Sequence, residues 1–502
     1  MKGTSTEQKA RPMAIKLSLD TIDQLPEGVA RPVYHRSALS PGILHFGVGN
    51  FHRAHQAMYL DRLMNKGQAY DWALIGAGVF EGERKGRDVL QKQDWLTTLV
   101  EQEADSSTAR VLGSMVDYVE PADAGAIVAR MAQPDIRIVS LTITEGGYFL
   151  DSDDNFDPSH PMIVADAQEP DAPETVFGMI LRGLRARRDA GLAPFTVMCC
   201  DNVPHNGDVT RRTLTGLAGL SDPDFADWIT ENVAFPNAMV DRITPATSDR
   251  ERAMLRDEFG VEDGWPVFCE DFTQWVLEDN FPLGRPPLEE AGAQFVDDVT
   301  PFEIMKLRIL NGGHATIAYP GGLLDIHFVH EAMEHPLIRA FLRKLEESEI
   351  IPTVPPVPDT DTSEYFDLIE RRFSNPKIGD TVRRLCLDGS NRQPKFIVPV
   401  IRDVLKADKP VSGLALESAL WCRYCAGSSD SGAEIAPNDP NWDALQEVAL
   451  KAKDNPQAWL DQKAIYGALG QDPRFADPFA DWLGKLWSDG TAKTLSAYLE
   501  QD

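Results

Sequence analysis

The chain of 502 residues is too long for a single hydrophobic core, and about two or three domains are expected. Lysine and arginine number 49 against 78 aspartate and glutamate residues, and the net charge of -29 argues against nucleic acid or anionic membranes as partners. Six cysteines are too few for a disulfide framework, and neither a secretory signal nor a run of ~18 apolar residues occurs, which predicts a cytoplasmic protein without a membrane span.

Four short apolar segments in the first half of the chain predict buried strands. Glycine, proline or an acidic residue bounds each segment, and amphipathic stretches separate them. This alternation is typical of an α/β fold with a parallel sheet. The segments cover residues 43–49, 72–79, 137–143 and 195–200.

A glycine-rich turn follows the first of these strands. Gly47 and Gly49 stand between the strand and a helical pattern over residues 53–66, the order in which dinucleotide-binding folds present backbone N–H groups to a pyrophosphate. His52 replaces the third glycine of that motif. An ordinary strand-to-helix turn therefore remains the alternative.

An acidic residue after the second strand is a candidate for binding the ribose of a cofactor. A carboxylate at this place accepts hydrogen bonds from both ribose hydroxyls of NAD and repels the 2′-phosphate of NADP. Glu83 is our choice, with Glu81 as the alternative, and Arg84 and Lys85 beside it leave some tolerance for NADP.

From about residue 300 onward the pattern changes to long amphipathic helices. We expect an α/β domain over residues 1–296, with an extension over residues 1–28, and a mostly α-helical domain over residues 297–502. The proline-rich residues 351–358 predict an extended loop without a helix. The predicted helical segments include residues 336–350, 364–373, 414–424 and 478–499.

A lysine, an asparagine and a histidine lie close together at the start of the second domain. On a regular α-helix, Glu303, Lys306, Asn311 and His314 fall within roughly 140° of arc and could face one cavity. A buried lysine can act as a general base, and an amide can donate to a developing oxyanion. The alternative is a surface lysine beside a helix that ends at Asn311, with His314 as a core residue.

Two other groups of residues have spacings that occur in metal or redox sites. Cys422 and Cys425 have the spacing of a redox pair or of half a zinc site, but no second pair completes four ligands. His52 and His55 lie in the nucleotide turn. No metal site is expected.

Five segments together resemble the polyol-specific long-chain dehydrogenases, in the same order and with similar spacing, from about residue 30 to the C-terminus. The resemblance implies an N-terminal Rossmann-type domain that binds NAD, a largely helical C-terminal domain that binds substrate, and a metal-independent active site. The segments are residues 46–55, 142–148, 200–207, 235–243 and 305–314.

The resemblance also implies roles for individual residues. Lys306 is the implied general acid/base, and the amides of Asn202 and Asn311 form the implied oxyanion hole. His314 would help to position substrate, and Glu303 would lie on a proton path. Residues implied to bind polyol hydroxyls are Asp241, Arg384 and Arg392, and the candidate cofactor-binding residues are Gly47, Gly49, Asn50, Phe51, Arg53, Glu83 and Glu145. This chain departs from the family pattern at Gly313, where relatives commonly have serine, and at Arg392, where a close relative has lysine.

The implied activity is the reversible, NAD-dependent oxidation of D-mannitol to D-fructose by a monomer or small homo-oligomer. Residues 204–206 and 394–396 resemble the polyol enzymes more than the fructuronate reductases. Fructuronate reduction and D-arabinitol oxidation stay open as alternatives, with D-sorbitol as a further substrate. A non-catalytic NAD-binding sensor would be expected to lose Lys306, Asn202 or Asn311, and all three are present.

Overall fold

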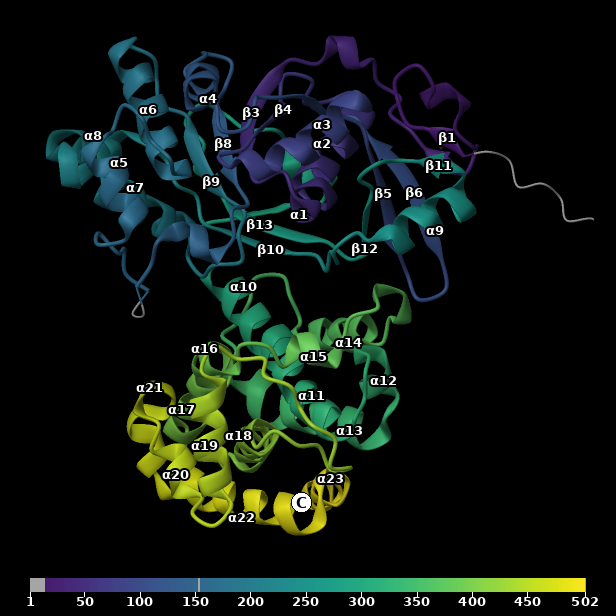
Figure 1. Cartoon of the computed structure of the whole chain (residues 1–502), viewed down its shortest axis with the longest axis vertical. Coiled ribbons are helices and arrows are strands. Elements are labelled where there is room, and N and C mark those ends of the chain that lie inside the picture. The colour runs from purple at the N-terminus through teal and green to yellow at the C-terminus, as the bar shows by residue number, and fades with distance from the viewer. Residues whose placement is uncertain (1–13, 152–153, 502) are drawn as a thin grey trace, which may run out of the picture. The chain divides into compact units, whose positions relative to one another are not determined.

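The computed structural model describes residues 14–151 and 154–501, and the chain divides into two compact units between Val299 and Thr300. The boundary expected from the sequence lies between residues 296 and 297. Figure 1 shows a first unit of strands and helices and a second unit built from helices. The first part of the expected N-terminal extension, residues 1–13, lies outside the described residues. Its last part contains β1 (Ile15–Lys16), which pairs with β11 (Val261–Glu262).

A five-stranded parallel sheet forms the centre of the first unit (Figure 1). All residues of β4, β8 and β9 are buried, which explains why the sequence shows continuous apolar runs. Phe46 pairs with both Ala77 and Leu141, so three neighbouring strands end at the same level. The four predicted strands are confirmed, and β7 adds a fifth. The order is β7 (Met115–Tyr118), β4 (Ala73–Ala77), β3 (Pro41–Phe46), β8 (Ile138–Leu141) and β9 (Thr196–Cys199).

Helices cover both faces of this sheet. Ile43 packs in a hydrophobic cluster with α2, whereas Leu44 packs in a second cluster with α4, α6 and α7, because successive side chains of a strand point to opposite faces. The helix predicted over residues 53–66 is divided at His55. The helices are α1 (Asn50–Ala54), α2 (Gln56–Asn65), α3 (Arg84–Lys92), α4 (Ala124–Met131), α5 (Pro161–Gln168), α6 (Val176–Asp189), α7 (Asn206–Ser221), α8 (Pro223–Asn232) and α9 (Asp249–Phe259).

Two smaller sheets extend the first unit. One has the order β12-β5-β6-β2, and the other has the order β10-β13-β14. Asp241 is the last residue of β10, so this strand positions one of the candidate substrate-binding residues. The strands are β2 (Val29–Ala30), β5 (Thr97–Gln102), β6 (Ser107–Leu112), β10 (Ala238–Asp241), β12 (Val267–Glu270), β13 (Gln274–Glu278) and β14 (Gln294–Val296).

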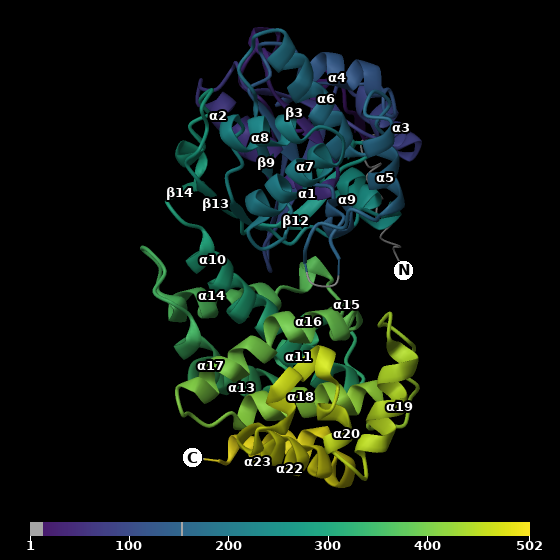
Figure 2. The ribbon, with the colours of Figure 1, turned by 90° about the vertical axis from the view of Figure 1, so that its left-hand side faces the viewer.

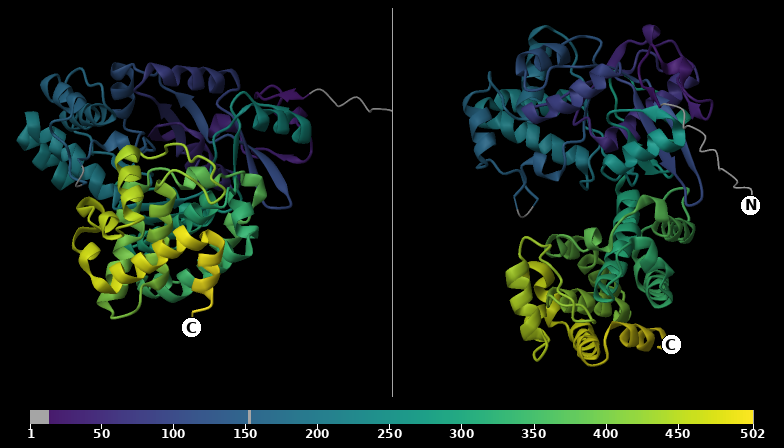
Figure 3. Two further views of the ribbon diagram at one scale, coloured as in Figure 1. Left: turned by 60° about the horizontal axis from the view of Figure 1, so that its bottom comes forward. Right: turned by 45° about the vertical axis from the view of Figure 1, so that its right-hand side comes forward.

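The second unit is a set of packed helices (Figures 2 and 3). Helix α18 is buried along almost its whole length and packs against α22 and α11. The α-helices of the second unit are α10 (Thr300–Met305), α11 (Gly312–Leu323), α12 (Val329–Glu334), α13 (Pro336–Leu345), α14 (Thr362–Phe373), α15 (Val382–Leu385), α16 (Gly389–Phe396), α17 (Val398–Lys406), α18 (Ser412–Cys425), α19 (Trp442–Ala452), α20 (Gln457–Leu460), α21 (Lys463–Tyr466), α22 (Pro473–Asp489) and α23 (Thr491–Leu499).

Two segments of this unit are π-helices, which are rare and are frequently found at functional sites. They are η6 (Lys306–Asn311) and η7 (Glu346–Ile350), and they pack against each other. The regular α-helix expected from the sequence over residues 306–311 was wrong, whereas the helix predicted over residues 336–350 is present and its last five residues are π-helical. The loop predicted over residues 351–358 begins with a 3-10 helix, Ile351–Thr353, in which Pro352 fits the first turn.

Two buried glutamates of η7 have very different surroundings. Glu349 accepts hydrogen bonds from the backbone N–H groups of Gly413 and Leu414, at 2.7 and 2.9 Å, and so caps the start of α18. Glu346 is fully buried, and neither of its carboxyl oxygens has a hydrogen-bond partner among the described residues. Burial raises the pKa of both side chains, to about 7 for Glu349 and well above the usual value for Glu346.

We predict that Glu346→Leu stabilises the protein by about 1–3 kcal/mol, because it removes an unsatisfied polar group. Glu349→Leu should destabilise the protein by about the same amount, because it leaves two backbone N–H groups unpaired. Since Glu346 has a higher pKa in the folded chain than its unfolded value near 4.5, the folded chain binds more protons. Stability therefore falls as pH rises above that value, and Glu346→Leu should stabilise more at pH 8 than at pH 5. Calorimetric melting at both pH values measures this, and equal or opposite shifts would contradict it.

Candidate active site

The glycine turn after β3 lies directly against the end of β8. Gly47 has a φ of +89°, and a Cβ atom there would lie 2.0 Å from the carbonyl oxygen of Thr142. The hydroxyl of Thr142 donates to the carbonyl oxygen of Gly47 at 2.7 Å. Only glycine fits this position, and the close approach brings the first turn of the nucleotide motif beside the segment that contains Glu145.

His52, which replaces the expected third glycine, packs beneath the same turn. Its ring stacks on His45 of β3, with 3.5 Å between the ring centroids. His45 makes hydrogen bonds to Ser140 at 2.8 Å and to Thr142 at 2.9 Å. Burial lowers the pKa of both histidines, to about 3 for His45. The two rings are therefore neutral packing groups, and the departure from the glycine motif has a structural cause.

Arg53 supports the turn from within the protein. Its guanidinium donates to the carbonyl oxygen of Gly49 at 3.2 Å, to the side chain of Asn50 at 2.8 Å and to the carbonyl oxygen of Trp265. It is only 1% exposed, and burial lowers its pKa to about 9. Arg53 thus positions Gly49 and Asn50, and its charge does not face solvent as a phosphate-binding arginine would. The ring of Phe51, half-buried, stacks on His55.

Glu83 lies over the end of β4. A Cβ atom on Gly78 would be 2.8 Å from its carboxyl group, and its Oε2 accepts from the N–H of Phe80 at 2.9 Å. Burial raises the pKa of Glu83. Glu81 has a side chain that is 71% exposed and pairs with Arg84 at 3.2 Å. Of the two candidates, Glu83 lies at the end of the strand, where a carboxylate could accept hydrogen bonds from the hydroxyls of a ribose.

A buried carboxylate that the sequence did not single out holds the next part of this edge together. Asp201 accepts from the N–H groups of Ile143 and Thr144, both at 2.9 Å, and from the hydroxyl of Tyr148 at 2.6 Å. It thereby joins the segment after β8, with exposed Glu145, to the segment after β9, where exposed Asn202 follows. In the sequence, Asp201 could have been recognised by its position inside the motif of residues 200–207.

Asp241 is buried at the end of β10, and the next residue explains how it is held. The guanidinium of Arg242 donates to the carbonyl oxygens of Ala54 and Glu270, at 2.6 and 2.9 Å, and to the carboxylate of Glu101 at 2.6 Å. Arg242 therefore ties β10 to α1, β12 and β5. The residue after Asp241 is in this way joined to the end of α1, the helix that follows the glycine turn.

In the second unit, Lys306 and Asn311 are the first and last residues of η6. Residues five apart are about 140° apart around an α-helix, but they lie on about the same face of a π-helix, whose hydrogen bonds close five residues on. The π-helix therefore brings Lys306 and Asn311 to the same side. Lys306 is only 7% exposed, and the helix continues past Asn311 into α11, so the alternative of a surface lysine at a helix end was wrong.

The neighbours of η6 contain the other candidate residues of this unit. The ring of His314, the third residue of α11, stacks on the ring of Phe373 with 4.3 Å between the centroids, and Glu303 is half-buried on α10. Helix α16, with Arg392, packs against η6 and α11, while α15, with Arg384, packs against α11. Arg384 forms a two-bond ion pair with Asp380. Arg392 donates to the carbonyl oxygen of Leu385 at 3.2 Å.

The two cysteines with metal-site spacing are interior residues. Cys422 and Cys425 are buried in α18, and burial raises the pKa of both thiols, which disfavours the thiolate that a metal or redox site uses. Among residues 14–151 and 154–501, no three histidine, cysteine, aspartate or glutamate side chains are grouped as a metal site would require. Within the same residues, no helix is long and apolar enough to span a membrane.

Comparison with known proteins places this arrangement in a family. Residues 41–290 match the Rossmann domain of mannitol dehydrogenase, and residues 298–487 match the mannitol dehydrogenase C-terminal domain. A mannitol 2-dehydrogenase from Cereibacter sphaeroides is 56% identical over 95% of this chain and 100% of its own length. One from Neosartorya fischeri is 42% identical over 97% of this chain and 99% of its own.

Two solved structures are also similar. Mannitol 2-dehydrogenase of Pseudomonas fluorescens, in a ternary complex with NAD and D-mannitol, has 43% identity and a TM-score of 0.86 over 97% of this chain and all of its own. A substrate-free D-sorbitol dehydrogenase has 36% identity and a TM-score of 0.89 over 95% of this chain and all of its own. The matches cover both units, and the chain belongs to the mannitol dehydrogenase family.

Proposed function

We propose that this protein is an NAD-dependent polyol dehydrogenase that interconverts D-mannitol and D-fructose, with Lys306 as its general acid/base. The observation that carries the proposal is the π-helix η6, which brings a buried lysine and an asparagine amide to one side. Desolvation disfavours the ammonium form of a buried lysine, and this suits a base that works near neutral pH. The high identity to a relative named mannitol 2-dehydrogenase supports the choice of substrate.

The residues at the edge of the parallel sheet fit NAD. The turn at Gly47 and Gly49 leads into α1. Apart from its chain neighbours, a Cβ atom on Gly49 would have only the carbonyl oxygen of Gly47 within 4 Å among the described residues, so a pyrophosphate could approach the backbone closely. Glu83 at the end of the neighbouring strand supplies the acceptor for two ribose hydroxyls. When bound, the nicotinamide accepts the hydride that the alcohol carbon loses.

The roles of the chain's own residues follow from the charge that develops during oxidation. Loss of hydride from a secondary alcohol requires loss of its hydroxyl proton, which Lys306 takes up, and Lys306 returns the proton when a ketose is reduced. The amides of Asn202 and Asn311 would donate to the oxygen on which negative charge accumulates. His314, Asp241 and Arg392 would hold the remaining hydroxyls of the chain. In this mechanism the amides do the work that a zinc ion does in other alcohol dehydrogenases.

One of the two candidate arginines is already paired, which leaves less positive charge available to a uronate than two unpaired arginines would offer. A carboxylate substrate needs an arginine whose charge is available. Arg384 is already paired with Asp380, which raises its pKa and neutralises its charge. Arg392 has no acidic partner within ion-pair distance among the described residues, so it is the one of the two that could hold a carboxylate.

Lys306→Ala should lower turnover by ~10²-fold or more and leave NAD binding unchanged, because it removes the proton acceptor from the second unit and leaves the nucleotide edge intact. Steady-state oxidation of mannitol and NAD titration by fluorescence measure the two effects. Added primary amines should restore part of the lost activity.

A matched control is the other cation of η6. Arg308 donates to the carbonyl oxygen of Thr353 at 2.6 Å and to Asp403, so Arg308→Ala should lower the melting temperature and keep most of the turnover. Near-native turnover in Lys306→Ala, or an equal loss in Arg308→Ala, would refute Lys306 as the base.

Glu83→Ala should raise KM for NAD by about tenfold or more and leave KM for NADP unchanged or lower, because it removes a charged hydrogen-bond acceptor of the ribose. Glu81→Ala is the control, since its exposed side chain pairs with Arg84. The ratio of kcat/KM with NAD to that with NADP decides the matter. If only Glu81→Ala changes this ratio, then Glu81 and not Glu83 binds the ribose.

D-Fructose should be reduced more efficiently than D-fructuronate at equal NADH, because Arg384 is committed to Asp380. Replacing Asp380 by asparagine releases that charge, and the variant should gain efficiency with fructuronate relative to fructose. Measured kcat/KM for both ketoses tests this in the two proteins. A wild-type preference for fructuronate would overturn the mannitol assignment and leave the role of Lys306 standing.

A further inference from the structure

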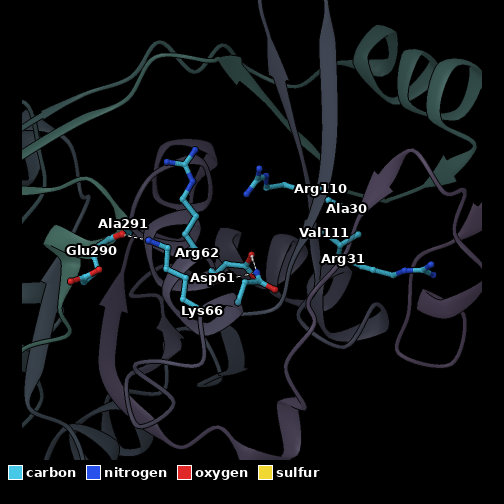
Figure 4. Close-up of a pocket in the computed structure, with 10 residues that line it drawn as sticks. Ala30, Arg31, Asp61, Arg62, Lys66, Arg110, Val111, Glu290 and Ala291 are labelled. Atoms are coloured by element: carbon cyan, nitrogen blue, oxygen red, sulfur yellow. Dashed lines mark hydrogen bonds between the residues drawn. The ribbon is translucent and has the colours of Figure 1, made fainter.

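A pocket of about 350 Å³ lies in the first unit, away from the nucleotide edge (Figure 4). It is lined by the last turn of α2, by β2 and β6, and by η5 (Leu288–Ala291). Helix α1 and the first five residues of α2, about 7.5 Å of helix, stand between the nucleotide turn and Asp61, the first residue of α2 that lines the pocket. The pocket is therefore a separate site with its own lining.

Positive charge exceeds negative charge on one side of this pocket. Three arginines share the carboxylate of Glu101: Arg242 at 2.6 Å, Arg62 at 3.2 Å and Arg110 at 3.3 Å. Arg242 is fully buried and makes the shortest contact, so it takes most of the neutralising effect of Glu101. Arg62 and Arg110 have side chains that are 29% and 32% exposed, and their guanidinium groups extend toward the same space in Figure 4.

The other charged groups of the pocket do not cancel this excess. Lys66 donates to the backbone carbonyl oxygen of Glu290, and no carboxylate of the described residues lies within ion-pair distance of its ammonium group. The carboxylate of Asp61 is 1% exposed and already accepts from Tyr34, Gly113 and Asn65. The carboxylate of Glu290 points away from the arginines in Figure 4.

We propose that this pocket, with Arg62, Lys66 and Arg110, binds a small molecule that carries a phosphate group. Guanidinium groups match the geometry of phosphate oxygens with paired hydrogen bonds, and the ammonium of Lys66 adds a point charge. The volume is that of a ligand of sugar-phosphate size. In a chain with a net charge of -29, an anion is attracted only where cations gather locally, as they do here.

Isothermal titration of the NAD-saturated protein tests the proposal, since NAD then fills the proposed nucleotide site. The probes are inorganic phosphate, glucose 6-phosphate and glucose. Binding of both phosphates assigns the site to the phosphate group itself, and binding of glucose 6-phosphate alone assigns it to a sugar phosphate. In either case Lys66→Ala/Arg110→Ala should weaken binding by about tenfold or more, and binding should weaken as salt rises.

Two variants serve as controls. Arg130→Ala changes an arginine that lines another surface hollow but is neutralised by Asp135, through hydrogen bonds of 2.8 and 2.9 Å, and it should leave phosphate binding unchanged. Lys66→Ala alone removes a single hydrogen bond to a carbonyl oxygen and should keep the wild-type melting temperature while weakening phosphate binding. The proposal fails if neither phosphate binds the wild-type protein, if glucose binds equally well, or if the double variant binds phosphate with undiminished affinity.

Discussion

The close approach of the turn after β3 to the end of β8 is the constraint on which the rest of the first unit depends. Because a side chain at Gly47 would collide with the carbonyl oxygen of Thr142, this contact exists only with glycine. It sets the position of α1 and allows His52 to stack on His45. Asp201 continues the same edge to β9, where Asn202 follows. One packing contact thus orders the cofactor turn, and one carboxylate connects it to a residue proposed for catalysis.

Two kinds of buried ionisable residue occur in the part of the chain that the structure describes. Arg53, Asp201 and Arg242 are buried with their hydrogen-bonding groups engaged, and each joins segments that are distant in the sequence. Burying a charge is costly unless it is paired or hydrogen-bonded, so such residues rigidify the loops that they join. Glu346 is of the other kind, since its carboxyl group is buried beside Gly313 without a partner among the described residues. The unpartnered carboxyl group of Glu346 therefore lowers the stability of the fold next to the proposed catalytic segment.

The fold class and four of the five central strands could be predicted from the sequence because buried parallel strands leave continuous apolar runs. The residues of the candidate site were recognised through motifs, but three features of their arrangement were not. Arg53 is among the candidate cofactor-binding residues of the sequence, whereas the structure buries its side chain. Asp201 and Arg242 act through backbone groups far away in the chain, which no local pattern reveals. The hydrogen-bond pattern of a π-helix leaves no periodic signal in the sequence, so the α-helical period gave the wrong angle between Lys306 and Asn311.

The π-helix also links the candidate site to residues that lie far from it. Converting η6 into an α-helix would shift α11 by one residue in register, a movement of about 1.5 Å along its axis and about 100° around it. Ten of the twelve residues of α11 are buried against other helices, and these contacts oppose such a screw motion. Core residues such as Ile317, which belong to no motif, therefore hold Lys306 and Asn311 on one side. Substitutions that loosen α11 would change the register of the helix and with it the relative positions of Lys306 and Asn311, without replacing either residue.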